Sequence, residues 1–381
     1  MHEKKIVIAT HQMLYGASQA LRDYLLKKKI NELVYIGLPL VENKITSFHQ
    51  FKKGKLVKSI EIKRRQVFGP LDYFTDAFFV FWWCIRLRGR YDVFIGVDPL
   101  NCIVGILLRL LGKTERVIFY SIDFVPVRFG NRLLNNIYHL LERLSVVFSN
   151  ERWNVSPRIA EGRERFLKIS EKKYRQNVVP IGIWNKKIKK TPFEKIKKHE
   201  LLFVGHLIEK QGVQLVLDAI PQIIKKIPNF KFLIIGGGEY ETKLKEKVKE
   251  LDIQKYVKFQ GWVKDRSKLE EMMSESACAA ALYKPEEEKL YNFTYYADPT
   301  KLKDYLGAGL PIILTDVPYN AGQIQSKKCG IIVSYSKNEV ARAVVDLMKD
   351  TEKLKNFRLN ALEMAKEFEW TNIFDRAFGR L

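Results

Sequence analysis

Short apolar runs rich in β-branched residues alternate along this chain with longer amphipathic segments. This alternation is typical of βαβ units, in which helices connect parallel strands and cover the sheet. Two such series are visible. In the first we expect strands at 6–9, 33–37, 93–96, 117–120 and 153–155 and helices at 17–28, 101–111 and 133–149.

The second series has the same character. We expect its strands at 201–204, 231–235, 257–260, 278–282 and 311–314 and its helices at 213–225, 241–250, 267–274, 300–306 and 338–349. A chain of 381 residues can hold two domains of ordinary size. The pattern therefore predicts an α/β protein with two Rossmann-like domains built on parallel sheets.

A polar, lysine-dense stretch separates the two series. It indicates an exposed linker at 184–199, between an N-terminal domain over 1–183 and a C-terminal domain over 200–350. The tail at 351–381 is helical in pattern and carries several aromatic residues. Two placements are open for it, on its own domain or back on the first.

The chain is strongly basic, with 66 Lys and Arg against 43 Asp and Glu. Most of the excess lies in residues 1–180, which hold 31 basic and 16 acidic side chains. Such a field attracts nucleic acid, anionic lipid headgroups or phosphorylated small molecules, and charge alone does not choose among them. No helix-turn-helix, zinc module or RNA-binding motif accompanies the charge, so nucleic-acid binding is a remote alternative.

Cysteine usage and hydropathy bear on the compartment. The four cysteines stand far apart, which predicts a reducing environment without structural zinc. The N-terminal stretch does not read as a signal peptide, and the longest apolar runs, 77–84 and 102–108, are too short to cross a bilayer. We expect a cytoplasmic protein, and binding to the inner face of the cell membrane stays open.

Three loops after predicted strands are suited to phosphate. Gly236–Gly238 joins a strand to a helix, and Gly205 begins a similar turn that ends at Gly212. Backbone N–H groups and the helix dipole favour anions at such turns. Thr300 begins a third helix, and Lys301 in its first turn is locally unfavourable unless a phosphate accompanies it. Together the loops predict a nucleotide at the carboxyl edge of the second sheet.

Four segments of the second half carry a family resemblance: LLFVGHLIEKQGVQLVLDAI, FLIIGGGEYETKL, VKFQGWV and PTKLKDYLGAGLPII. In order and spacing they resemble the donor domain of retaining GT-B glycosyltransferases, particularly glycosyltransferase family 4, the glycosyl transferases group 1. The first half resembles these enzymes more loosely, through GASQALRDYL and YSIDFVPVRFGN. The resemblance implies two Rossmann-like domains facing across a cleft, a nucleoside-diphosphate sugar as donor, retention of configuration, and no metal or other cofactor.

The resemblance also implies a donor-binding set. Its members are Gly16, Gly205, His206, Lys210, Gln211, Gly236, Gly237, Gly238, Trp262, Thr300, Lys301, Leu302 and Asp304. His206 and Gln211 stand where the family usually has Arg and Lys, and Tyr296 stands where it has the first of two Glu residues. Asp304 takes the place of the second Glu and could accept hydrogen bonds from ribose. Asp298 or a glutamate of 286–288 could replace the first.

The first half supplies the acceptor candidates. Asp123 follows a predicted strand, with Arg128 five residues on, and could orient the acceptor as a base or be a structural turn carboxylate. A cationic run precedes the aromatic stretch 75–90 and comprises Lys52, Lys53, Lys55, Lys58, Lys63, Arg64 and Arg65. It would suit an anionic membrane or a polyprenyl-phosphate headgroup. The alternative is a solvated hairpin followed by a buried helix over 78–85.

The function predicted from the sequence is transfer of a sugar from a nucleoside-diphosphate sugar to a lipid-linked or glycan acceptor. Asp123, Asp298 and Asp304 are the catalytic candidates. Two alternatives of another class share the fold: a sugar-nucleotide 2-epimerase and a non-catalytic partner.

Overall fold

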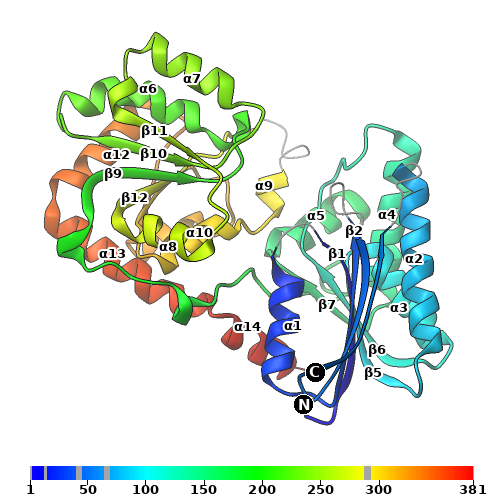
Figure 1. Ribbon diagram of the computed structural model, residues 1–381. Coiled ribbons are helices and arrows are strands. Elements are labelled where there is room, and N and C mark those ends of the chain that lie inside the picture. The colour runs from blue at the N-terminus through cyan, green and yellow to red at the C-terminus, as the bar shows by residue number, and fades with distance from the viewer. Residues whose placement is uncertain (1, 13–14, 40–44, 64–68, 287–292, 381) are drawn as a thin grey trace. The chain divides into compact units, whose positions relative to one another are not determined.

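The computed structural model describes residues 2–380 except 13–14, 40–44, 64–68 and 287–292. The chain divides into two compact α/β units (Figure 1). The N-terminal unit comprises residues 1–181 together with 373–381, and the C-terminal unit comprises residues 182–372. Each unit has its own sheet.

The sheet of the N-terminal unit has the strand order β4-β3-β2-β1-β5-β6-β7-β8. Its strands are β1 (Lys5–Gln12), β2 (Glu32–Pro39), β3 (Ile45–Lys52), β4 (Lys55–Lys63), β5 (Tyr91–Val97), β6 (Thr114–Ser121), β7 (Glu151–Asn154) and β8 (Asn177–Val178). The strands β2, β1, β5, β6, β7 and β8 pair with their neighbours in parallel. At the edge of the sheet, β3 pairs antiparallel with β2 and forms an antiparallel hairpin with β4.

Helices cover both faces of this sheet. They are α1 (Ala17–Lys27), α2 (Gly69–Arg86), α3 (Pro99–Leu110), α4 (Arg132–Phe148) and α5 (Pro157–Leu167). Three begin at side chains that accept a hydrogen bond from the first turn, Asp98 for α3, Asn131 for α4 and Ser156 for α5. Helices α2, α3 and α4 lie along one flank of the unit (Figure 1).

The cationic run forms the hairpin β3–β4, and the aromatic stretch forms α2. Residues 55–59 of the hairpin are exposed, as in the solvated alternative. Helix α2 is only partly buried: Val80 and Cys84 join the core, while Phe78 and Trp82 are exposed.

The end of the chain belongs to the N-terminal unit. In α14 (Trp370–Phe378), Phe374 and Phe378 lie against the Tyr24 ring, with centroid distances of 5.3 and 6.1 Å. The Tyr24 hydroxyl donates a hydrogen bond of 2.6 Å to Asp375. Of the tail 351–381, for which two placements were open, residues 351–372 stay with the C-terminal unit and residues 373–381 join the N-terminal unit.

The sheet of the C-terminal unit is parallel throughout, in the order β11-β10-β9-β12-β13-β14. Its strands are β9 (Lys197–Val204), β10 (Lys231–Ile235), β11 (Val257–Gly261), β12 (Ser276–Ala281), β13 (Ile312–Leu314) and β14 (Gly330–Ile332). Its helices are α6 (Val213–Ile224), α7 (Glu241–Glu250), α8 (Arg266–Glu275), α9 (Phe293–Tyr296), α10 (Thr300–Gly307), α11 (Ala321–Ser326), α12 (Lys337–Lys349) and α13 (Thr351–Ala365).

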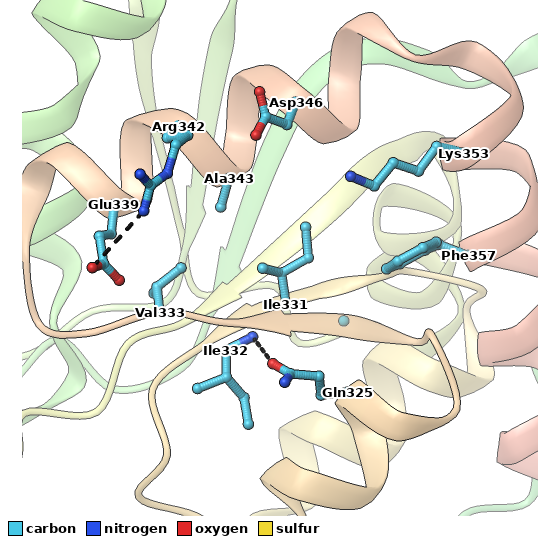
Figure 2. A pocket seen from close by; sticks show the side chains of 11 residues that line it. Gln325, Ile331, Ile332, Val333, Glu339, Arg342, Ala343, Asp346, Lys353 and Phe357 are labelled. Carbon is cyan, nitrogen blue, oxygen red and sulfur yellow. Dashed lines mark hydrogen bonds and ion pairs between the residues drawn. The ribbon is translucent and has the colours of Figure 1, made fainter.

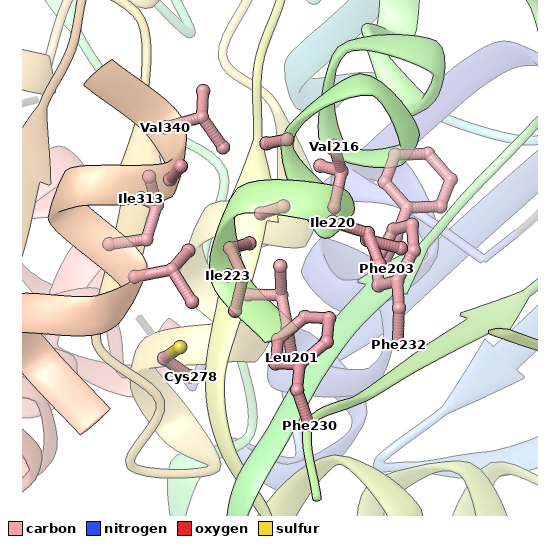
Figure 3. Packing of buried hydrophobic residues seen from close by; sticks show 14 of the residues in the cluster. Leu201, Phe203, Val216, Ile220, Ile223, Phe230, Phe232, Cys278, Ile313 and Val340 are labelled. Carbon is pink, nitrogen blue, oxygen red and sulfur yellow. The ribbon is translucent and has the colours of Figure 1, made fainter. Parts of the chain in front are cut away.

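Two hydrophobic clusters lie on opposite faces of this second sheet. Figure 3 shows one of them, where Leu201 and Phe203 of β9 pack with Val216 and Ile220 of α6. The other joins the sheet to α10 and α13. Burial on both faces explains why these strands read as continuous apolar runs, as is usual in parallel sheets.

The segment expected as an exposed linker is packed on the C-terminal unit. Ile188 and Ile196 are buried in its two clusters, and β9 begins at Lys197. The lysines of the segment are exposed, as expected for a linker, while the two isoleucines fix it to the C-terminal unit. The first of the two segments that form the N-terminal unit ends at residue 181.

Candidate functional site

Two glycine turns of the C-terminal unit touch each other where β9 and β10 end. The Gly205 N–H donates to the Ile235 carbonyl at 3.0 Å, and the Gly236 N–H donates to the Gly261 carbonyl at 2.9 Å. A Cβ atom on Gly236 would stand 1.9 Å from the Gly205 carbonyl oxygen, and Gly236 has a φ of +132°. Only glycine permits this approach.

The rest of the second turn packs against the first. The Gly237 carbonyl accepts a hydrogen bond of 2.9 Å from the Leu207 N–H, and a Cβ on Gly238 would stand 2.5 Å from the Leu207 carbonyl oxygen. Trp262 lies over Gly237, with its indole nitrogen 2.8 Å from where a Cβ would be, and is 64% exposed. Narrow backbone turns with an exposed aromatic beside them form a surface that a planar, anionic ligand can approach.

Lys301 reaches the first turn from α10. A Cβ on Gly205 would lie 2.8 Å from the Lys301 ammonium, which donates a hydrogen bond of 2.5 Å to the Gln211 side chain. The ammonium also lies 4.3 Å from the centroid of the Phe203 ring. Burial lowers the pKa of Lys301 to about 7. The structure thus brings Gly205, Gln211 and Lys301 together.

The two neighbours of Lys301 differ in exposure. Thr300 is exposed at the start of α10. Leu302 is 0% exposed, and its N–H donates to the Pro299 carbonyl at 3.3 Å. Leu302 was expected in the donor-binding set, but its side chain packs in the core, so it supports α10 rather than contacting a ligand.

Two further polar residues of the turn between Gly205 and Gly212, His206 and Lys210, lie beside carboxylates. The Nε2 atom of His206 lies 3.2 Å from Glu239, and both side chains are exposed. Lys210 forms an ion pair with Glu286. Neither pair includes Lys301. Residues 287 and 288, the other glutamates considered as partners, lie outside the described residues.

The two aspartates of this unit differ sharply. Asp304 accepts hydrogen bonds of 2.5 and 3.3 Å from the Arg266 guanidinium, which also reaches Glu270 at 2.7 Å. Asp298 forms an ion pair with Lys303, and both side chains are fully buried. A carboxylate enclosed in this way holds the α10 region together and does not reach a substrate, contrary to the catalytic role expected for Asp298.

The candidates of the N-terminal unit lie at the ends of its elements. Gly16 precedes α1, where its N–H donates to the Gln19 side chain at 2.9 Å. Asp123, after β6, is exposed and accepts a hydrogen bond of 2.9 Å from Arg128. Four of the cationic residues are exposed on the hairpin, namely Lys52, Lys55, Lys58 and Lys63, and Lys53 is exposed in its turn. Arg64 and Arg65 lie outside the described residues.

A buried charge cluster in the same unit was not predicted from the sequence. His11 on β1 places Nδ1 at 2.7 Å from Asp98 and Nε2 at 3.2 Å from Asp76. Burial alone would lower the pKa of His11, but the two carboxylates outweigh it and raise the pKa to about 9. Asp76 directly precedes the apolar run 77–84 of α2, and an acid at this position is the one local signal of the cluster. Nothing local connects residues so far apart in the chain.

A separate pocket of about 280 Å³ lies elsewhere on the C-terminal unit (Figure 2). Its lining comes from β14, α11, α12 and α13, with Arg342, Asp346 and Lys353 at its rim. The glycine turns and Lys301 belong to other elements. We therefore place the candidate site at the ends of β9 and β10.

A parallel sheet whose strands end in glycine turns, with a cation in the first turn of an adjoining helix, is an arrangement found in α/β proteins that bind nucleotides. Residues 185–364 match the family Glycosyl transferases group 1. The match covers the residues that carry the sequence motifs, and the resemblance found in them is confirmed.

The curated relatives cover parts of the chain. An uncharacterized glycosyltransferase of Haemophilus influenzae is 34% identical over 89 residues, which are 23% of this chain and 25% of that protein. The alpha-monoglucosyldiacylglycerol synthase of Streptococcus pneumoniae is 24% identical over 160 residues, 42% of this chain and 34% of that protein. The chain thus matches from a quarter to a third of the length of these relatives.

Solved structures resemble the whole chain. HepE of Anabaena, solved in complex with UDP and glucose, superposes with a TM-score of 0.70 over 100% of both chains at 13% identity. At this identity the likeness concerns the fold, which is that of the GT-B glycosyltransferases. The predicted fold class, two α/β domains with largely parallel sheets, is confirmed.

Proposed function

We propose that this protein transfers a sugar from a nucleoside-diphosphate sugar to a lipid-linked or glycan acceptor, with retention of configuration and without a metal ion. The observation that carries the proposal is the convergence of Gly205, Gly236 and Lys301 at one edge of the second sheet. A helix N-terminus and a lysine are groups that bind a diphosphate, and glycine turns let it approach the backbone closely.

Lys301 has the properties of a diphosphate ligand. Its ammonium is enclosed beside Phe203 and Tyr283, and burial costs it part of its charge. A diphosphate placed beside it would supply the missing counter-charge and raise the pKa of Lys301 again. In the complex the protonated lysine would donate to the leaving phosphate, where negative charge develops as the glycosidic bond breaks.

The remaining groups fit donor recognition. Trp262 offers an exposed ring beside Gly237, and Asp304, whose carboxylate is held by Arg266, would accept hydrogen bonds from hydroxyl groups such as those of ribose. The sugar would then react from the face that the phosphate leaves, as the family resemblance suggests. The protein contributes positioning and electrostatics and does not need a carboxylate nucleophile.

The N-terminal unit would receive the acceptor. Asp123 and Arg128 form an exposed ion pair after β6 and are our candidates for orienting the acceptor hydroxyl. The strong positive charge of this unit suits an acceptor that carries phosphate or lies in an anionic membrane. We propose that the protein works at the inner face of the cell membrane. The name of the Streptococcus pneumoniae relative, which specifies a glucosyldiacylglycerol, agrees with a lipid acceptor.

Thermal melting with UDP, GDP and ADP and with their sugars tests donor binding. A nucleotide at about 100 times its Kd should stabilise the protein by about 2.7 kcal/mol. Lys301→Met should weaken this nucleotide about 10- to 100-fold, the effect of losing a charge-assisted hydrogen bond. Lys226→Met, which removes an exposed lysine after α6, is the matched control and should change nothing.

Product analysis tests the reaction. Release of the nucleoside diphosphate together with a glycosylated acceptor of unchanged anomeric configuration would support transfer with retention. Release of an epimer of the donor sugar would contradict transfer, and so would a full panel of nucleotides that leaves the melting temperature unchanged.

A further inference from the structure

Helix α2 exposes a row of aromatic side chains. Phe74, Phe78 and Trp82 recur every four residues, so they lie on one side of the helix, and Phe74 and Phe78 are 67% and 56% exposed. The Phe78 and Trp82 rings stack at a centroid distance of 5.7 Å. Large aromatics in such a row are unusual on a surface that faces only water.

The two neighbouring helices also expose apolar side chains. Helix α3 packs against both α2 and α4, and the three lie side by side in Figure 1. Seven exposed aliphatic or aromatic residues lie on α3, at its C-terminal end, or on α4. They are Leu107, Leu110, Leu111, Leu133, Ile137, Leu140 and Phe148. We call the exposed apolar residues of α2, α3 and α4 the three-helix face.

The exposed charges on these helices are positive, and the acidic side chains are buried or partly covered. Arg86, Arg132 and Arg143 are exposed, and the Arg86 guanidinium lies 3.6 Å from the centroid of the Trp82 ring. Over 72–86, 99–110 and 132–148, no exposed side chain is acidic. The acids there are turned inward or partly covered, for instance Glu142, which pairs with Arg163 in the interior.

We propose that the three-helix face docks on an anionic lipid bilayer, with its apolar side chains at the level of the headgroups and its arginines on lipid phosphates. Amphipathic surfaces that combine aromatic residues with cations bind in this way without spanning the membrane. No helix among the described residues has the length and apolarity to cross a bilayer. Docking by this face would bring the protein to a lipid-linked acceptor, and in this it rests on the proposed function.

Charge decides between a bilayer and a second copy of this chain. A symmetric dimer through the three-helix face would place arginines against arginines, whereas anionic headgroups complement them. The three-helix face is distinct from the hairpin β3–β4, whose cationic run was one candidate for membrane contact. In the hairpin, whose residues 45–63 are all described, the exposed lysines are accompanied by three large exposed apolar side chains, Ile45 on β3 and Leu56 and Val57 on β4.

Vesicle flotation with the full chain tests the proposal. The chain should float with vesicles of equal parts phosphatidylcholine and phosphatidylglycerol and much less with phosphatidylcholine alone. Phe74→Ser combined with Phe78→Ser should weaken flotation at least about tenfold, because two large apolar side chains no longer enter the bilayer. Leu359→Ser is the matched control, since Leu359 is an exposed apolar residue on α13, and it should float like the parent chain.

Three results would overturn the proposal: no flotation of the parent chain, equal flotation of the double variant, or a dimer in sedimentation that only the double variant disrupts. Thermal stabilisation by a nucleoside diphosphate is measured on the same samples. If it persists while flotation fails, the docking surface is wrong and the proposed transferase stands. If the nucleoside diphosphate does not stabilise a protein that floats, the proposed transferase is wrong and the docking surface stands.

Discussion

His11 gives the N-terminal unit a stability that depends on its proton. The imidazole on β1 meets Asp98 at one nitrogen and Asp76 of α2 at the other, at 2.7 and 3.2 Å. The Asn101 amide nitrogen lies 3.4 Å from Nδ1, and the Tyr73 ring approaches edge-on. The perturbation is a change of pH, combined with His11→Gln, which removes the charge.

The size and sign follow from the shifted pKa. The pKa of His11 rises from 6.5 to about 9 in the folded protein. Each pKa unit is worth about 1.36 kcal/mol, so the native proton contributes roughly 3 kcal/mol. Because the folded state holds the proton more tightly, this stability is fully present below pH 6.5 and is lost as pH rises through about 9.

Urea unfolding at a series of pH values measures the effect. The relevant quantity is the free energy of unfolding of the parent minus that of His11→Gln, which should fall by roughly 3 kcal/mol between pH 6 and pH 10. Lys301 titrates in the other direction, because its folded pKa is lowered, but it is present in both proteins and cancels.

His49→Gln is the matched control. His49 lies on β3, where burial lowers its pKa, so its replacement should leave the pH dependence above pH 7 unchanged. Parallel stability curves for the parent and His11→Gln across the whole range would refute the reasoning. They would mean that the carboxylates do not hold a proton on His11.

Three further predictions concern buried groups. At pH 8 Lys301 should be about nine-tenths neutral, so UDP binding should take up close to one proton, measured by calorimetry in buffers of different ionisation enthalpy; Lys301→Met should take up none. Gly236→Ala should lower the melting temperature through a loss of at least about 2 kcal/mol, because its Cβ would clash with backbone, whereas Gly112→Ala meets open space and should cost only about 1 kcal/mol of backbone strain. Glu142→Leu should cost about 3–5 kcal/mol in urea unfolding, because it leaves the fully buried Arg163 without its carboxylate; a loss below about 1 kcal/mol would show that the pair is not essential.

Local pattern predicted most of the fold. The bounds of β10 and α7 agree with the expected ranges, because the change from a buried strand to an amphipathic helix is abrupt there. The packing of the expected linker at 184–199 was not predicted. Its two buried isoleucines stand among many lysines, and they were not enough to identify a packed segment. The short edge strands β8 and β14 carry little pattern of their own and were not predicted.

The candidate site divides in the same way. The turn at Gly236 and the lysine at the start of α10 were predicted because each stands directly after a strand or at a helix start, where local rules apply. The ion pair of Arg266 with Asp304, the burial of Asp298 and the His11 cluster depend on residues distant in the chain. Their partners are fixed only when the sheets assemble.

The position of α14 has a consequence for biosynthesis. Residues 373–381 belong to the N-terminal unit, yet the ribosome makes them after the whole C-terminal unit. Until they emerge, the Tyr24 and Trp153 rings lack the cover of Phe378. The first sheet is therefore synthesised early but completed late, and a nascent chain arrested before residue 373 would present uncovered aromatic side chains to chaperones.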